Sequence, residues 1–223
     1  FRISILIFSV IGFCLSLFPL ENFMSLINYF AYFTNQSNLF VMIYLIVMIT
    51  LSVNNLIQKN YTVPTIKPIL HLFVVFCITA TMLIFTGLTI YAILNNAFII
   101  IAKNTIHGIS AIIFHYVVPI SIIIDYIKFA PHGKITIKSA KDFCFFTLIY
   151  FLAIVLRAQT RTLMHNDPQV NYFSYYPYPF VDIEKLGLIK SLVSLTTSLT
   201  FFYVFSVVLI LIDQNLSKRQ IKS

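Results

Sequence analysis

A histidine lies in the middle of a long apolar run, four residues before a proline. His115 is the only Asp, Glu, Lys, Arg or His between Ile109 and Ile124, and Pro119 follows it. An ionisable side chain inside an apolar membrane segment is costly, which makes His115 a candidate functional residue. Because Pro119 has no N–H to donate to the carbonyl of His115, we expect the helix to be disrupted at the histidine.

Five consecutive polar residues near the start of another apolar run could supply a partner for this histidine: Thr34-Asn35-Gln36-Ser37-Asn38. One interpretation is that these side chains cap a helix or hydrogen-bond between helices. The other is a reactive site, in which the Thr34 hydroxyl is a nucleophile and His115 is its base. Measured from the expected helix starts, Thr34 lies roughly 6 Å and His115 roughly 15 Å along their helices, at about 1.5 Å per residue. A shift of either helix boundary by about two to four residues would remove much of this difference, and helix tilt or a start earlier than Phe30 would also reduce it.

Other ionisable residues could support such a site. His107 is eight residues before His115 and about 80° away around the helix, so it either lines the same cavity or caps the helix start. Arg157 and Arg161 end a further apolar run, where they either extend to lipid headgroups or bind a carboxylate. Asp125 is expected to anchor the turn after its helix together with Lys128.

The sequence contains no recognisable metal or haem signature. The relevant histidines are spread over different segments: His71, His107, His115 and His165. Three cysteines fall in apolar stretches without a CxxC: Cys14, Cys77 and Cys144. No HExxH, paired Glu-x-x-His or Cys/His spacing is present. We therefore expect no metal and no cofactor, and we interpret the cysteines as small core residues.

The elements that must position these residues are membrane helices. Of the 223 residues, 59% are hydrophobic and 10% are charged, and the mean hydropathy is +0.91, which is too apolar for a soluble domain. We predict an all-α integral membrane protein with six transmembrane helices in one bundle, a single domain covering 1–223. The approximate spans are 3–20, 30–56, 69–94, 105–127, 143–160 and 188–212. The connection 161–187 is aromatic, and we expect it to form a cap over the outer mouth of the bundle.

Charge placement predicts the orientation and the partners. The net charge of +8 could suggest nucleic acid, but the cations lie in short loops and terminal segments, where membrane topology explains them. With the N-terminus inside, ten Lys and Arg residues lie inside and five outside, which favours both termini in the cytoplasm. We expect a multi-pass protein of the cell membrane that contacts membrane lipids and no nucleic acid. The sequence leaves the oligomeric state open.

Three short motifs occur in an order that resembles a known family. They are Tyr32-Phe33-Thr34-Asn35-Gln36-Ser37-Asn38-Leu39, His115-Tyr116-Val117-Val118-Pro119 with Asp125, and Tyr178-Pro179-Phe180-Val181-Asp182 with Gly187. This order resembles the bacterial Pr6Pr integral membrane family and, more distantly, the eukaryotic androgen-induced membrane hydrolases. The resemblance implies six helices and cytoplasmic termini. The eukaryotic members are intramembrane threonine hydrolases of fatty acid esters of hydroxy fatty acids, and their Thr and His would fall on Thr34 and His115.

The resemblance departs from the family at one point, because the spacing from His115 to Pro119 is one residue shorter than in the eukaryotic enzymes. A slip of one residue rotates a side chain by about 100° around a helix, so His107 stays an alternative functional histidine. With Thr34 as nucleophile and His115 as base, the resemblance predicts a hydrolase of lipid (fatty acyl) esters.

The remaining candidate residues would support that reaction. Hydrogen-bond donors of residues 35–38 would stabilise the oxyanion of the reaction. Arg157 or Arg161 would hold a free carboxylate of the ligand. Tyr178 and Asp182 would belong to the cap over the site. The alternative is a non-enzymatic binding or transport protein with a buried histidine in a polar cavity. We find no internal repeat of the kind that transporters usually show.

Overall fold

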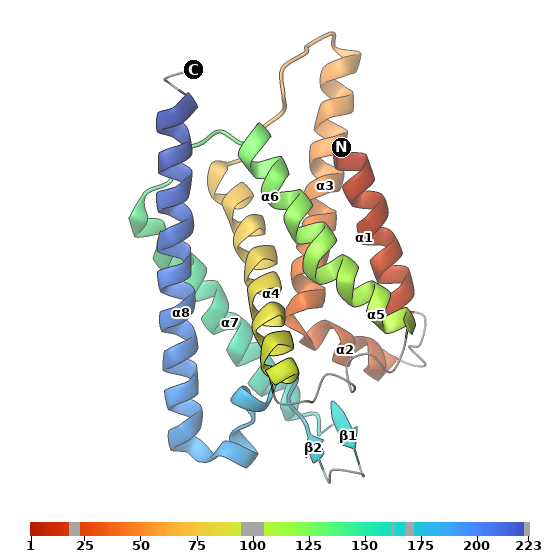
Figure 1. Cartoon of the computed structure of the whole chain (residues 1–223), viewed down its shortest axis with the longest axis vertical. Coiled ribbons are helices and arrows are strands. Elements are labelled where there is room, and N and C mark those ends of the chain that lie inside the picture. Colours follow the sequence, from red (N-terminus) through yellow and green to blue (C-terminus); the bar gives the residue numbers. More distant parts are fainter. Residues whose placement is uncertain (18–22, 95–104, 162, 168–171, 221–223) are drawn as a thin grey trace. The chain divides into compact units, whose positions relative to one another are not determined.

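The computed structural model describes residues 1–17, 23–94, 105–161, 163–167 and 172–220, and most of these residues are helical (Figure 1). The chain divides into two compact units. The first consists of Phe1–Glu21 and Phe33–Lys134, and the second consists of Asn22–Tyr32 and Ile135–Ser223. Thr34 and His115 both belong to the first unit.

The first unit is a bundle of helices around an apolar core. Its elements are α1 (Arg2–Leu17), α3 (Phe33–Ile57), α4 (Pro68–Leu94), α5 (Thr105–Ile112), the π-helix η2 (Ile113–Val117) and α6 (Val118–Phe129). α5, η2 and α6 follow one another as a continuous helical run, which packs against α1 and α4 (Figure 1). α3 packs against the same two helices. Side chains with no exposed surface fill the space between them, among them Val41, Leu45, Met48, Phe76 and Val118.

The second unit consists of two long helices with shorter elements before and between them. Its elements are α2 (Phe23–Ala31), η3 (Ile137–Ser139), α7 (Ala140–Ala158), β1 (His165–Asp167), β2 (Tyr172–Ser174), η4 (Pro179–Val181) and α8 (Ile183–Gln220). α7 packs along α8 (Figure 1). β1 and β2 pair as an antiparallel two-stranded sheet, with Asn166 opposite Phe173. The connection predicted at 161–187 therefore contains a small sheet, whereas no strand was predicted there.

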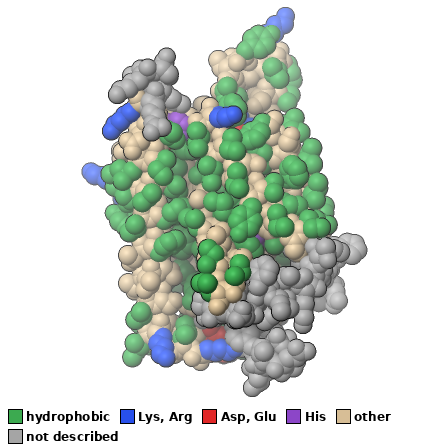
Figure 2. Space-filling model, in the orientation of Figure 1, with side chains coloured by type: hydrophobic (Ala, Val, Ile, Leu, Met, Phe, Trp, Pro, Cys, Tyr) green, Lys and Arg blue, Asp and Glu red, His purple; other side chains and the backbone are tan. Residues whose placement is uncertain are grey.

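The helices carry apolar side chains on their outward faces as well as in the core. Ile46, Leu152 and Val204 are half exposed or more, and hydrophobic side chains dominate the face shown in Figure 2. Five helical stretches are long and apolar enough to cross a membrane: Phe33–Ile57, Pro68–Ile90, Gly108–Phe129, Ile137–Ala158 and Ile183–Lys218. Helices that are apolar all round fit a lipid environment better than water. The described residues thus have the architecture of a helical, multi-pass membrane protein, as predicted.

The individual spans differ from the prediction at their ends. The apolar helix Arg2–Leu17 is shorter than those five, so the count of six spans and the sidedness stay predictions. The predicted last span, 188–212, is extended in both directions as α8. α8 contains one non-helical residue, Gly187, with φ of 75°. A Cβ at Gly187 would meet nothing within 4 Å, so the positive φ rather than crowding favours glycine there.

Candidate functional site

The structure brings the side chains of Thr34 and His115 together. The Thr34 Oγ1 lies 3.2 Å from the His115 Nε2, within hydrogen-bonding distance. Thr34 is the second residue of α3, and His115 is the central residue of η2. Both side chains are half-buried, so the pair retains some exposed surface. The hydroxyl and the imidazole are therefore placed as a nucleophile and a base require.

The π-helix around His115 results from the proline that follows. Pro119 lies in the first turn of α6 and has no N–H, so the α-helical hydrogen bond to the His115 carbonyl cannot form. The Val118 N–H instead bonds to the carbonyl of Ile113, five residues back. The predicted disruption at the histidine therefore takes the form of a π-helical turn. Such turns are frequent at functional sites.

The second ring nitrogen of His115 determines which tautomer the neutral ring adopts. The Nδ1 lies 2.8 Å from the carbonyl oxygen of Ala111. A carbonyl only accepts, so Nδ1 is the nitrogen that carries the proton. The Nε2 of the neutral ring then has a free lone pair, and it accepts from the hydroxyl of Thr34. In this arrangement the backbone carbonyl orients the imidazole and the Nε2 can take the threonine proton.

Packing holds both the His115 ring and the backbone next to it in position. Phe85 stacks on the imidazole with ring centroids 3.7 Å apart. Phe114, the residue before the histidine, lies against Gly12 of α1, where a Cβ would be only 2.4 Å from its Cε1 atom. Gly12 therefore allows α1 and η2 to approach closely, which fixes the backbone that carries His115.

The polar residues after Thr34 connect the two helices of the pair. The side-chain N–H₂ of Asn38 donates to the carbonyls of Thr34, at 2.9 Å, and of Phe114, at 3.4 Å. The hydroxyl of Ser37 donates to the carbonyl of Phe33 at 2.8 Å. These donors are directed at backbone carbonyls, so Ser37 and Asn38 position the site rather than offer hydrogens to an oxyanion. The other two predicted residues of this run differ in burial: Asn35 is buried and Gln36 is half-buried.

His107, the alternative histidine, lies on α5, eight residues before His115. Its backbone is helical, and its side chain lies outside what the structure describes. The choice of His115 as the functional histidine therefore rests on the contacts that His115 makes.

The two predicted arginines have protein partners within the second unit. Arg157, in the last turn of α7, donates from Nη1 to the carbonyl of Tyr175 at 2.6 Å and from Nη2 to the side-chain oxygen of Asn28. It thus joins α7 to α2 and to the segment before α8. Arg161 forms an exposed ion pair with Glu184. Both arginines thus have structural partners, and their predicted role in holding a carboxylate stays a prediction.

Asp182 and Tyr178 also have structural partners in this unit. Asp182 precedes α8, and its Oδ1 accepts from the backbone N–H of Lys185 at 3.2 Å, which is a helix N-cap. Its Oδ2 accepts from the Ser174 hydroxyl at 2.6 Å. Tyr178 stacks on Phe180 with ring centroids 5.2 Å apart. Asp182 therefore fixes the start of α8 on the strand β2.

A cavity of about 440 Å³ in the first unit lies away from the pair. It is bounded by the start of α1, the last turns of α3 and the connection that follows α3. Its lining includes Arg2, Val53, Tyr61, Pro64 and Phe129, and neither Thr34 nor His115 belongs to it. Because Thr34 is at the opposite end of α3, this cavity is not the substrate site of the threonine.

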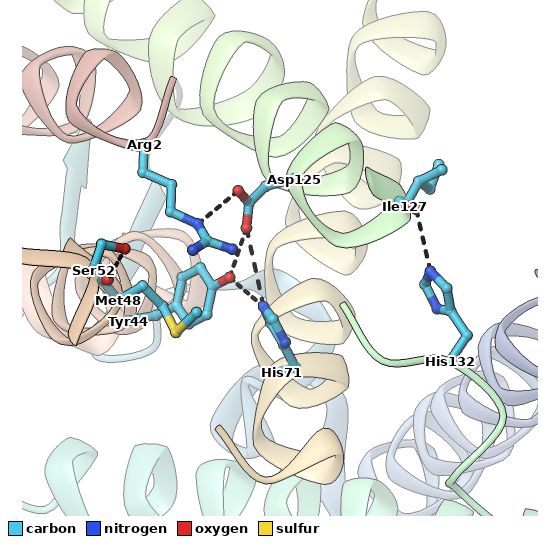
Figure 3. Close-up of polar contacts among 8 residues, drawn as sticks. All are labelled: Arg2, Tyr44, Met48, Ser52, His71, Asp125, Ile127 and His132. Carbon is cyan, nitrogen blue, oxygen red and sulfur yellow. Dashed lines mark hydrogen bonds and ion pairs between the residues drawn. The ribbon is translucent and has the colours of Figure 1, made fainter. Parts of the chain in front are cut away.

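Four residues that the sequence analysis did not group form a buried polar cluster (Figure 3). The Arg2 Nε lies 2.8 Å from the Asp125 Oδ1, and the Tyr44 hydroxyl donates to the Asp125 Oδ2 at 2.6 Å. The same hydroxyl contacts the Nε2 of His71. Asp125 is fully buried and bonds to other helices, so the predicted anchoring of its turn with Lys128 is wrong. We call Arg2, Tyr44, His71 and Asp125 the buried cluster.

The positions of the two sites share one regularity. Thr34 contacts the residue 81 positions later, His115, and Tyr44 contacts the residue 81 positions later, Asp125. α3 and the α5–η2–α6 run therefore lie in the same direction across this interval. The equal spacing of ten residues within each helix is visible in the sequence, but nothing in a single sequence marks it as a pair of contacts.

Comparison of the chain with protein-family models, with curated proteins and with solved structures finds no match in any of the three, so the site is interpreted from its geometry.

Proposed function

We propose that this chain is an intramembrane hydrolase of lipid (fatty acyl) esters, with Thr34 as nucleophile and His115 as base. The observation that supports this most is the orientation of the imidazole. With Nδ1 bonded to the Ala111 carbonyl, Nε2 is an acceptor 3.2 Å from the Thr34 hydroxyl. The resemblance of the sequence to the Pr6Pr family and to the androgen-induced hydrolases leads to the same two residues. Six spans with both termini cytoplasmic are part of this proposal.

The reaction follows from the two contacts. The Thr34 hydroxyl gives its proton to His115 Nε2 while its oxygen forms a bond to the ester carbonyl carbon. The tetrahedral intermediate expels the alcohol, which takes the proton from Nε2, and an acyl-threonine remains. A water molecule then gives a proton to Nε2 and attacks the acyl carbon. The fatty acid leaves, and the proton returns to the Thr34 oxygen.

The position of Thr34 at the start of α3 suits this chemistry. The N-terminal end of a helix carries partial positive charge, because the peptide dipoles of the helix are aligned. A negative oxygen that develops beside Thr34 is stabilised by that end of the helix. This replaces the predicted role of the Ser37 and Asn38 side chains, whose donors are directed at backbone carbonyls. The ester lies at the start of α3, and its acyl chain lies along the apolar outer faces of the helices.

Ester turnover by purified variants tests the proposal. We expect Thr34→Val, which keeps the side-chain volume and removes the hydroxyl, to lower kcat/KM for a long-chain acyl ester by about 10² or more. His115→Asn is expected to lower it similarly, and the double variant should be no worse than the worse of the two single variants, because the residues act as a unit. Thr50→Val is the matched control, since Thr50 is a threonine of α3 whose hydroxyl bonds to the Ile46 carbonyl.

A fluorophosphonate probe gives a second measurement. We expect it to label Thr34 in the wild type and in Thr50→Val, and to leave Thr34→Val unlabelled. Full turnover by folded Thr34→Val would refute the hydrolase. Stabilisation by a solute without any labelling would instead favour the non-enzymatic binding protein.

A further inference from the structure

The proposed hydrolysis makes no use of the buried cluster. Its four residues come from four helices: Arg2 from α1, Tyr44 from α3, His71 from α4 and Asp125 from α6. Asp125 has no exposed surface and His71 has 1%. Ionisable side chains so deeply buried in a membrane protein are costly, and they commonly mark a route or site for protons or ions.

The hydrogen bonds of the cluster have defined directions. The Tyr44 hydroxyl has one hydrogen, and it donates this hydrogen to the Asp125 Oδ2 at 2.6 Å (Figure 3). In the contact between Tyr44 and His71, the tyrosine oxygen is therefore the acceptor and the His71 Nε2–H is the donor. The result is a chain of hydrogen bonds that runs from His71 through Tyr44 to Asp125.

At its His71 end, this series of hydrogen bonds stops at a nitrogen that has no partner in the part of the chain that the structure describes. With the proton on Nε2, the Nδ1 of neutral His71 carries a lone pair. This atom is buried and has no hydrogen-bond partner among the described residues. A buried acceptor without a partner is unusual, because most buried polar atoms are paired. An imidazole nitrogen with a free lone pair can take up a proton.

Among the described residues, the titratable and charged groups recorded around His71 come from three helices and from one connecting segment. They are Arg2 of α1, Tyr44 of α3, and Asp125 and Tyr126 of α6, together with His132 of the segment that follows α6. Arg2 and Asp125 form one cation–anion pair, so the cluster with neutral histidine has no net charge. One added proton gives the cluster a single positive charge. The series of hydrogen bonds connects His71 with Asp125, which is the only carboxylate among these groups.

We propose that the buried cluster is a proton-binding site, which takes up one proton at the Nδ1 of His71 and holds it on Asp125. The added proton binds Nδ1, and the Nε2 proton of His71 passes to the Tyr44 oxygen. The original hydroxyl proton of Tyr44 passes to the Asp125 Oδ2. His71 ends neutral with its proton on Nδ1, Tyr44 is again a neutral phenol, and Asp125 is a carboxylic acid. The Arg2–Asp125 ion pair, which joins α1 to α6, then loses its negative partner.

Infrared difference spectroscopy on the full chain in detergent tests this site. When the pH is lowered, we expect the carbonyl band of a protonated carboxylic acid to appear in the wild type. The band should shift when aspartate is labelled with ¹³C, and it should be absent from Asp125→Asn. Asp213→Asn is the matched control, since Asp213 of α8 is also a fully buried aspartate, and the band should remain in it. Labelling identifies an aspartate band in the wild type even if the Asp125 variant does not fold.

A pH jump followed at this band tests the relay. We expect Tyr44→Phe and His71→Gln to slow its appearance at least tenfold, because each removes one link of the chain. Thr34→Val should show the wild-type band and rate, so failure of the proton site and failure of the hydrolase are distinguishable. Two results would overturn the proposal: no ¹³C-sensitive band from an aspartate at any pH at which the protein stays folded, or an unchanged rate in Tyr44→Phe.

Discussion

Removal of Arg2 should reveal how much the buried cluster depends on its single cation. In Arg2→Met the side-chain length is kept and the charge is lost. The buried Asp125 carboxylate then no longer has the guanidinium whose Nε lies 2.8 Å from its Oδ1. Breaking a buried ion pair by removing one partner costs about 3–5 kcal/mol. Since about 1.4 kcal/mol is a factor of ten, the unfolding equilibrium should change by about 10²–10⁴.

The cost should depend on the charge of Asp125 and not on the volume of Arg2. In Asp125→Asn the amide oxygen still accepts from Tyr44, but the negative charge is gone. Arg2→Met in that background should therefore cost no more than about 1 kcal/mol, because no buried charge is left alone. The difference between the two backgrounds is the coupling energy of the pair, and we expect at least about 2 kcal/mol.

Reversible unfolding in mixed micelles at neutral pH measures these free energies. Arg161→Met is the matched control, because Arg161 and Glu184 form an arginine–carboxylate pair whose side chains are 58% and 44% exposed. Exposed pairs contribute about 0–1 kcal/mol, so this variant should be close to the wild type. A cost below about 1 kcal/mol for Arg2→Met, or an equal cost in both backgrounds, would refute the reasoning.

Two further predictions concern packing and helix capping. Gly12→Ala places a Cβ 2.4 Å from the Phe114 ring and should cost about 1–3 kcal/mol by the same unfolding assay, whereas Gly87→Ala, with nothing within 4 Å, should be neutral or stabilising. An equal effect at the two glycines would contradict the close approach of α1 and η2. Asp182→Ala removes an N-cap and a buried hydrogen bond and should cost about 1–3 kcal/mol, against no more than about 1 kcal/mol for Glu184→Ala, whose ion pair is exposed. The N-cap assignment fails if Asp182→Ala unfolds like the wild type.

The membrane architecture could be predicted from the sequence because it depends on composition and on the length of apolar runs. The disruption at His115 could be predicted as well, since it follows from one missing N–H at Pro119. The pairing of Thr34 with His115 was predicted from a hydroxyl and an imidazole in two apolar runs and from the resemblance of the motif order to a known family. From the expected helix starts, the two residues differ by roughly 9 Å in depth at about 1.5 Å per residue, so their contact does not follow from their positions in the sequence. Neighbouring helices can be displaced relative to each other along their axes, and this displacement cannot be determined from a single sequence.

The buried cluster could not be predicted for a related reason. Arg2 reads as a cation that sets topology, Tyr44 as an aromatic residue in an apolar run, and Asp125 as the partner of a nearby lysine. Each of these interpretations uses only neighbours in the sequence. The actual partners depend on which helices adjoin and on how each is rotated, and both follow from packing. The sheet β1–β2 escaped prediction because strands of three residues show too little alternation to be recognised.

The equal offset of the two contacts between α3 and the α5–η2–α6 run has a consequence for how this chain can vary. Two helices with apolar surfaces can slide and turn against each other in lipid with little penalty. Polar contacts at Thr34 and at Tyr44, about 15 Å apart along α3 at about 1.5 Å per residue, allow one depth and one rotation. A single residue inserted between them would rotate one of the two side chains by about 100° away from its partner, while the other contact would be preserved. Variation in length should therefore be confined to the connections, while the ten-residue intervals 34–44 and 115–125 keep their length together.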